Sequence, residues 1–128
     1  MAFIDTYEEF KRKQNNFVIK VERDQFIPPK RFKNGKHLNY YIRIYIAYGE
    51  GEYSNAYQLS DITLVKYELH SSYRERFRTS DSRASGFDIK VWSYGYYPIQ
   101  ATIYLRLGDP LKINGMVQFP VTEAERNM

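Results

Sequence analysis

The chain has 128 residues, which is enough for one domain with a substantial hydrophobic core but too few for two. It contains no cysteine, which excludes disulfides and thiolate metal sites and favours a reduced, cytoplasmic location. A net charge of +4 is too small to indicate a nucleic-acid-binding tail. The sequence has no apolar run of about eighteen residues and no apolar leader, so we expect no membrane segment and no signal peptide.

The segment 1–16 has the pattern of a short helix. Phe3, Tyr7 and Phe10 recur at helical spacing, and Asp5 can cap the first turn. Acidic residues precede basic ones along the segment, which suits the helix dipole. We expect its apolar stripe to pack on the domain, although such a helix could equally mediate dimerisation.

Alternation of apolar and polar residues predicts strands through most of the remaining chain. The alternating segments are 17–22, 40–47, 59–69, 87–91, 97–105 and 111–121. The run 59–69 changes its apolar phase near Lys66, which predicts a kink there. Asn114-Gly115 is a strong hairpin dipeptide inside the last run, and we interpret it as a bulge.

Short strands with a turn signal about every ten residues, and no crossover helices, predict an all-β fold. Thirteen tyrosines agree with this, since tyrosine suits a pleated surface with one apolar and one wet side. We therefore expect an antiparallel two-sheet sandwich over residues 17–121. The polar tail 122–128 is expected to fray.

Basic residues gather in three places that the pattern leaves outside strands. They are Lys11 to Lys13, then Lys30, Arg31, Lys33 and Lys36, then Arg74, Arg76, Arg78 and Arg83. We interpret these clusters as solvated loops. The alternative is a nucleic-acid-binding surface, although the sequence contains no known nucleic-acid-binding motif beside the clusters.

The residues needed for catalysis are scarce. His70 precedes Ser71 and Ser72, but neighbours on a strand point to opposite faces and no G-x-S-x-G turn presents a serine. His37 and His70 are far apart in the sequence, and the acidic residues show no metal-ligand spacing. We therefore expect no enzyme, no metal and no cofactor.

Two aromatic segments continue beyond the ends of predicted strands, into what should be loops. They are Leu69-His70-Ser71-Ser72-Tyr73 and Tyr94-Gly95-Tyr96-Tyr97. Aromatic rings on loops either pack locally or meet a ligand, so these segments are the best candidates for a binding site. Tyr97 shares the phase of the strand that follows and should be core, and Trp92 is expected to be a structural plug beneath the loop.

These segments resemble the YEATS domain, and more closely its prokaryotic relatives. In that family a strand ends in L-H-x-S-[FY], and after a loop a G-[WY]-x-x-[FY] turn leads into an alternating strand. Leu69 to Tyr73 and Ser93 to Tyr97 fall in those places, with Ser93 where the family has glycine and Tyr73 where phenylalanine is commoner. The resemblance runs from about residue 18 to 121 and implies an immunoglobulin-like sandwich.

The resemblance also implies a site for an acylated lysine or a similar planar acyl group. Tyr73 and Tyr94 would form the walls of an aromatic slot. Gly95 and Tyr96, which follow Tyr94 in its turn, would also belong to the site. Ser72 would hydrogen-bond the acyl amide, the backbone N–H of Tyr94 would donate to the acyl carbonyl, and His70 would orient the ligand from the rim. A further aromatic residue or histidine reaches in, for which His37, Tyr40 and Trp92 are the candidates.

The function that the resemblance implies is a non-enzymatic reader of an acylated protein or peptide. Prokaryotic members resemble sensors attached to effectors, so we expect an effector protein as partner. The alternative is an interaction subunit of a bacterial or phage conflict (defence) system, whose slot has lost ligand binding and whose basic loops contact protein or nucleic acid. Salt dependence separates the two, because phosphate binding weakens steeply with salt.

Overall fold

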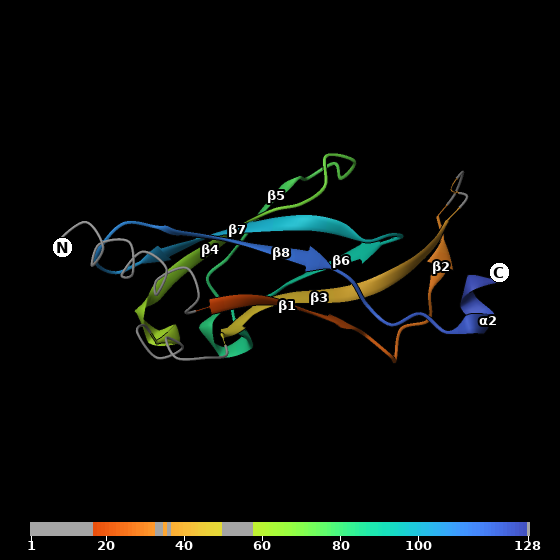
Figure 1. Cartoon of the computed structure of the whole chain (residues 1–128), viewed down its shortest axis with the longest axis horizontal. Helices are drawn as coiled ribbons and strands as arrows, with labels where there is room; N and C mark the ends of the chain where they lie inside the picture. Colours follow the sequence, from red (N-terminus) through yellow and green to blue (C-terminus); the bar gives the residue numbers. More distant parts are fainter. Residues whose placement is uncertain (1–16, 33–34, 36, 50–57, 128) are drawn as a thin grey trace, which may run out of the picture.

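Two four-stranded antiparallel sheets pack face to face in the computed structural model, which describes residues 17–32, 35, 37–49 and 58–127 (Figure 1). The prediction of an immunoglobulin-like sandwich is confirmed. The helix predicted over 1–16 and the basic cluster Lys11 to Lys13 lie outside the described residues. Among those residues, no helix has both the length and the apolar character needed to cross a membrane.

The first sheet is organised around one long strand, β3 (Leu38–Tyr48). It pairs with each of the other three strands, which are β1 (Phe17–Arg23), β2 (Lys30–Arg31) and β6 (Ile89–Ser93). Ile42, Ile44 and Ile46 of β3 are fully buried, as their alternation with polar residues predicts.

The second sheet has the strand order β5–β4–β7–β8. Its strands are β5 (Phe77–Ser80), β4 (Ile62–Glu68), β7 (Tyr97–Leu105) and β8 (Leu111–Val117). Ile99, Ala101 and Ile103 of β7 are buried, which confirms the inward face expected for 97–105.

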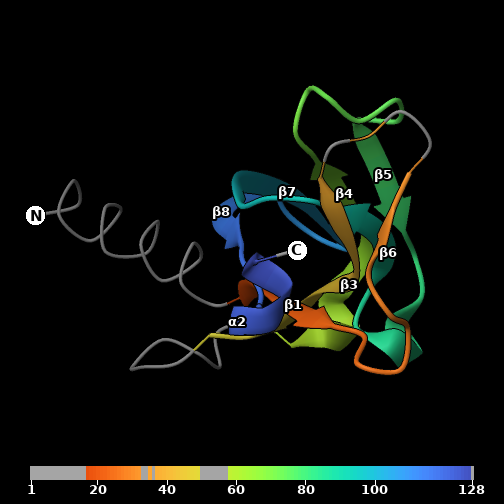
Figure 2. The same ribbon diagram turned by 90° about the vertical axis from the view of Figure 1, so that its right-hand side faces the viewer.

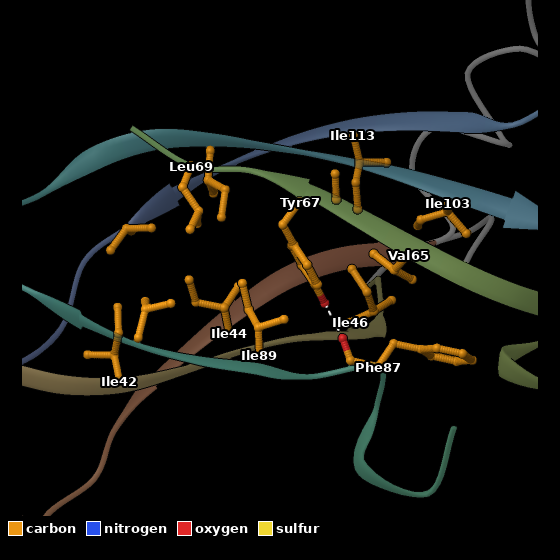
Figure 3. Close-up of a cluster of buried hydrophobic side chains, with 14 of the residues drawn as sticks. Ile42, Ile44, Ile46, Val65, Tyr67, Leu69, Phe87, Ile89, Ile103 and Ile113 are labelled. Atoms are coloured by element: carbon orange, nitrogen blue, oxygen red, sulfur yellow. Dashed lines mark hydrogen bonds between the residues drawn. The ribbon is translucent and has the colours of Figure 1, made fainter. Parts of the chain in front are cut away.

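A tyrosine hydroxyl connects the two sheets inside the core. Tyr67 of β4 is fully buried, and its hydroxyl donates to the carbonyl of Phe87 at 2.5 Å, just before β6 (Figure 3). Burial raises the pKa of Tyr67, so the hydroxyl keeps its proton and remains a donor. Phe87 itself has φ 56° and follows Gly86 at φ 70°, so a tight left-handed turn presents this carbonyl to the core.

The segment 59–69 bends at a different place from the one its pattern suggested. It begins as a 3₁₀ turn, η1 (Leu59–Asp61), and only then enters β4. The pairing of β4 with β7 shifts register between Ile62 and Leu64, so the apolar phase changes there and the kink predicted at Lys66 is wrong. Beyond the shift Val65, Tyr67 and Leu69 all face the core.

The bulge predicted at Asn114-Gly115 is also wrong. β8 pairs with β7 in one unbroken register, in which Gly115 lies opposite Ile99. A Cβ atom on Gly115 would lie 3.1 Å from Cβ of Ile19 in β1. Glycine stands here because the two sheets approach closely at this point, and not because the chain turns.

The polar stretch after Tyr73 contains an edge strand that the sequence pattern missed. β5 pairs with β4 alone, and its single large apolar residue, Phe77, is half-exposed. Lys30, Arg31 and Arg78 therefore lie in strands, so the expectation of basic clusters confined to loops is wrong for these three residues. A second 3₁₀ turn, η2 (Arg83–Ser85), leads toward β6.

The C-terminal tail is held in place, and the expectation that it frays is wrong for the described residues up to Asn127. It forms one helical turn, α2 (Glu123–Arg126), beside the end of β1 (Figure 2). Thr122 and Glu125 form a capping box, in which the Thr122 hydroxyl accepts from the Glu125 N–H at 3.2 Å. Arg23 of β1 then binds the Glu125 carboxylate through two nitrogens, one at 2.7 Å.

Candidate functional site

A cavity of about 260 Å³ lies between the loop that follows β4 and the turn that joins β6 to β7. Its lining contains all six residues that the resemblance placed in the slot, together with Trp92. The lining residues are Asn39, His70, Ser72, Tyr73, Trp92, Ser93, Tyr94, Gly95, Tyr96 and Tyr97. The fold thus brings two segments that are about twenty residues apart in sequence to the two sides of one cavity.

The first loop is closed by backbone hydrogen bonds. The Leu69 N–H donates to the Arg76 carbonyl at 2.7 Å, and the Tyr73 N–H donates to the His70 carbonyl at 3.1 Å. Leu69 is buried and anchors the start of the loop in the core. The loop therefore presents His70 and Ser72 to solvent from a fixed base.

His70 orients the hydroxyl of Ser72. The Ser72 N–H donates to His70 Nδ1 at 3.1 Å, so this nitrogen carries a lone pair and the proton of the neutral ring is on Nε2. Ser72 Oγ lies 2.7 Å from the same Nδ1, and with the ring proton on Nε2 the hydroxyl donates to this nitrogen and shares its lone pair with the Ser72 N–H. The lone pairs of Ser72 Oγ then remain available to accept an N–H from a ligand.

This contact also corrects an expectation from the sequence, which held the histidine and serine side chains apart on opposite faces. His70 and Ser72 lie beyond the end of β4, in a turn closed by the hydrogen bond from the Tyr73 N–H to the His70 carbonyl, and this turn brings the two side chains together. No carboxylate among the described residues hydrogen-bonds His70, so the arrangement lacks the third member of a hydrolytic triad.

Tyr73 forms one wall, and its hydroxyl is bound within the protein. It donates to the Trp92 carbonyl at 2.7 Å, and the Tyr97 hydroxyl donates to it at 3.2 Å. Burial, with the bond to Tyr73, raises the pKa of Tyr97 far above its ordinary value. The Tyr73 hydroxyl thus ties the first loop to β6, a bond that a phenylalanine at this position could not make.

The second turn is held from both sides. The Tyr94 side chain is 52% exposed, and its ring stacks on His37 with centroids 4.7 Å apart and an angle of 13° between the planes. The Tyr96 hydroxyl donates to the Phe119 carbonyl, and the Tyr96 ring meets the Phe119 ring edge-on. Ser93 Oγ donates to the Gly95 carbonyl at 2.8 Å, which closes the turn at the position where the family has glycine.

Trp92 borders the cavity, but its ring does not plug the space beneath the loop as expected. Its neighbours Val91 and Ser93 face the core, so the ring lies on the outer face of the first sheet. There it packs against Phe32 and Tyr41, with centroids 5.6 Å and 5.0 Å away.

A second hollow, of about 470 Å³, lies on the other side of the 94–96 turn, and His37 and Tyr40 line it instead of the cavity. Tyr40 is 5% exposed and packs on Phe119. The residues lining the second hollow are Arg31, His37, Leu38, Tyr40, Tyr94, Gly95, Tyr96, Phe119, Val121, Glu125 and Arg126.

Sequence reasoning missed several lining residues because no local pattern marks them. Asn39 is nearly buried at the start of β3, where its side-chain amide donates to the His37 carbonyl at 3.0 Å. Phe119 reaches the second hollow by packing on Tyr40 and Tyr96, and Arg126 reaches it on α2, which Arg23 of β1 holds, so both depend on long-range contacts.

The described residues contain no cluster of three or more histidine, cysteine or acidic side chains that could hold a metal ion. What the cavity offers is an aromatic lining with a few polar groups, namely an oriented serine hydroxyl and the backbone of a short turn. Such a lining suits a flat or apolar group that ends in an amide.

The sequence-family model of the prokaryotic YEATS domain matches residues 40–115. This range is more than half of the chain and includes both sides of the cavity. No curated protein sequence matches significantly. The fold is similar to a solved structure of the Yaf9 YEATS domain recognizing an H3K122suc peptide, with a TM-score of 0.56 and 15% identity over 85% of this chain and 72% of that chain.

Two further structures are similar at the same TM-score of 0.56. One is the Yaf9 YEATS domain bound to H3K27ac, with 16% identity over 85% of this chain and 72% of that one. The other is the yeast AF-9 homolog protein Yaf9, with 16% identity over 81% and 69% of the two chains. At these identities the likeness shows the fold, and the family match adds the sequence relation. The chain belongs to the prokaryotic YEATS domain family.

Proposed function

We propose that this YEATS domain is a non-enzymatic reader that binds an acylated lysine, or a similar planar acyl group, in the cavity between the 69–73 loop and the 94–97 turn. The observation that carries the proposal is the convergence of all six motif residues on one cavity. Structures similar in fold have been solved with acylated histone peptides, which supports the same kind of ligand here.

The rings of Tyr73 and Tyr94 flank the acyl group, whose flat face and apolar chain they shield from water. Ser72 Oγ accepts the N–H of the acyl amide, because its own hydrogen is donated to His70. The Tyr94 backbone N–H donates to the acyl carbonyl. An unmodified lysine ends in an ammonium group, which can donate hydrogen bonds but cannot accept one. It therefore cannot take the place of the acyl carbonyl that the Tyr94 N–H recognises.

The alternative, a phosphate-binding surface formed by the basic loops, has less support. Arg76 pairs with Glu68 at 2.7 Å, and Arg78 lies 4.0 Å from Glu75. Lys30 sits over the Trp92 ring, 4.5 Å from its centroid. These charges already have partners within the domain, which lowers their attraction for a polyanion. An effector partner and a role in a conflict system stay predictions from the resemblance, and a cytoplasmic location stays a prediction from the absence of cysteine.

Calorimetric titration with acetyl-lysine, crotonyl-lysine and unmodified peptides of one sequence tests the proposal, repeated at about 50 and 200 mM salt. We expect an acylated peptide to bind more tightly than the unmodified one, with affinity that changes little with salt because a neutral group is recognised. Equal affinity for all three peptides would remove the acyl-lysine proposal. Binding of DNA or RNA with a steep salt dependence would instead support the alternative, in which the basic surface binds nucleic acid.

A further inference from the structure

We propose that the second hollow binds the carboxylate of an acidic residue that flanks the acylated lysine, so that the ligand is an acidic segment of protein. This inference rests on the proposed function of the neighbouring cavity. Tyr94, Gly95 and Tyr96 line both spaces, so the same turn separates them. A peptide whose modified lysine occupies the cavity must continue past this turn, and a residue in extended chain advances about 3.3 Å. A flanking side chain can therefore reach the second hollow.

Cationic side chains predominate in the lining of the second hollow. Arg31 and Arg126 approach it from β2 and α2, and His37 adds an imidazole ring. An acidic side chain would be attracted here, and a lysine- or arginine-rich flank would be repelled.

The one carboxylate in the lining does not cancel this charge. Glu125 is bound by Arg23 through two nitrogens, and its capping bond to Thr122 uses one of the same oxygens. The hydrogen bond from Arg23 lowers the pKa of Glu125 to about 2, so the pair stays an ion pair of no net charge. The Arg126 side chain makes no ion pair with any residue that the structure describes.

An apolar floor strengthens the site. Leu38, Phe119 and Val121 line the hollow together with the cationic side chains, and Phe119 is buried. A carboxylate bound against such a surface meets guanidinium groups with less intervening water than on an open face, and a charge-assisted hydrogen bond to arginine is stronger there.

The test uses acetyl-lysine peptides in which the positions within three residues of the modified lysine carry aspartate, alanine or lysine, each with an unmodified counterpart. Binding is measured for the wild-type domain, for the double variant Arg31→Gln/Arg126→Gln, and for Arg83→Gln as the matched control. Arg83 is exposed on η2, at the start of β6, whereas both hollows lie at its end. Arg126→Gln alone, on an exposed side chain, replaces the double variant if the latter does not fold.

We expect the wild type to bind an aspartate-flanked acetyl-lysine peptide about five times more tightly than the alanine-flanked one, the size of one partly exposed charge pair. The ratio should fall toward one in the arginine variant and persist in Arg83→Gln, while the preference for acetylated over unmodified lysine remains in both.

Equal affinity for aspartate and alanine flanks, with acetyl dependence intact, overturns this inference and leaves the reader function standing. An aspartate preference that survives in the arginine variant overturns its assignment to the second hollow. Absence of acetyl dependence in every peptide overturns the reader function and this inference with it.

Discussion

Three tyrosine hydroxyls at the cavity are bound within the protein before any ligand arrives. Tyr73 donates to the Trp92 carbonyl, Tyr97 donates to Tyr73, and Tyr96 donates to the Phe119 carbonyl. The tyrosines thus fix the shape of the cavity, whereas Ser72, whose single hydrogen is donated to His70, keeps acceptor capacity. Shape and chemistry are supplied by different residues.

Tyr94→Ala should abolish most ligand affinity and leave the sandwich folded. The ring is half-exposed and stacks only on His37 among the described rings, so few core contacts are lost. Loss of a stacked ring at a binding centre costs about 2 kcal/mol, or roughly thirtyfold in Kd, measured by calorimetry with an acylated peptide.

Tyr97→Ala should, in contrast, act first on the stability of the fold. Its ring is 8% exposed and packs on Tyr73, so truncation should lower the free energy of unfolding by about 3 to 5 kcal/mol in a denaturant titration. Unfolding of Tyr94→Ala, or a normal stability for Tyr97→Ala, would contradict these roles.

His70→Ala should weaken binding through Ser72. Without Nδ1 the Ser72 hydroxyl rotates freely and can no longer be held as an acceptor, so each single variant, His70→Ala or Ser72→Ala, should lose about 1 kcal/mol of binding free energy. In a double-mutant cycle the two losses should not add, because they remove one function. Additive losses would show that His70 acts on the ligand independently of Ser72.

At the scale of elements, β1, β8 and α2 determine how the ends of the sandwich close. β1 lies against Gly115 of β8, and at its far end Arg23 binds Glu125 of α2. Arg23 also donates to the Pro120 carbonyl at 3.1 Å. One strand therefore holds the tail that forms part of the second hollow.

Gly115→Ala should destabilise the sandwich by about 1 kcal/mol or more, measured by thermal or denaturant unfolding. The new Cβ would lie 3.1 Å from Cβ of Ile19, an atom next to the backbone that cannot rotate away, so the sheets must shift. Asn114→Ala, exposed on the same strand, should be close to neutral. A Gly115→Ala variant as stable as the wild type would mean that the sheets are not in close contact there.

The attachment of α2 should persist well into acid. The pKa of Glu125 is lowered from its ordinary 4.5 to about 2, chiefly by the hydrogen bond from Arg23. A depressed carboxyl pKa contributes stability that is complete above the unfolded pKa and is lost as the pH falls from about 4.5 through about 2. NMR titration of the Glu125 carboxyl should show this midpoint, and Arg23→Met should move it up toward the ordinary value. Titration near 4.5 in the wild type would contradict the pairing.

The elements show where sequence reasoning succeeds. Strict alternation predicted the inward faces of β3 and β7, because one side of each strand is buried. β5 was missed because an edge strand can be exposed on both sides, and α2 was missed because Arg23, which holds it, is about a hundred residues away in sequence. The motif residues of the cavity were predicted from local segments, whereas the second hollow depends on this long-range contact.

At the scale of the whole molecule, the two sheets bring four separate segments to one end of the sandwich. They are the start of β3, the loop after β4, the turn before β7 and the tail from Phe119 to Arg126, and β2 adds Arg31 as a fifth. Hydrogen bonds hold the loop, the turn and the tail to neighbouring backbone. The cavity is therefore formed in advance, and we expect the backbone to move little when a ligand binds.

The most direct test of the central claim is an NMR titration of the isotope-labelled domain with an acetyl-lysine peptide, read at each backbone amide and compared with the unmodified peptide. The account predicts saturable shifts centred on Ser72, Tyr73, Tyr94 and Gly95, with much smaller shifts from the unmodified peptide and from the acetylated peptide added to Tyr94→Ala. Equal shifts with both peptides, or shifts centred on Phe32 and Tyr41 of the outer face, would contradict the claim that this cavity reads an acyl group.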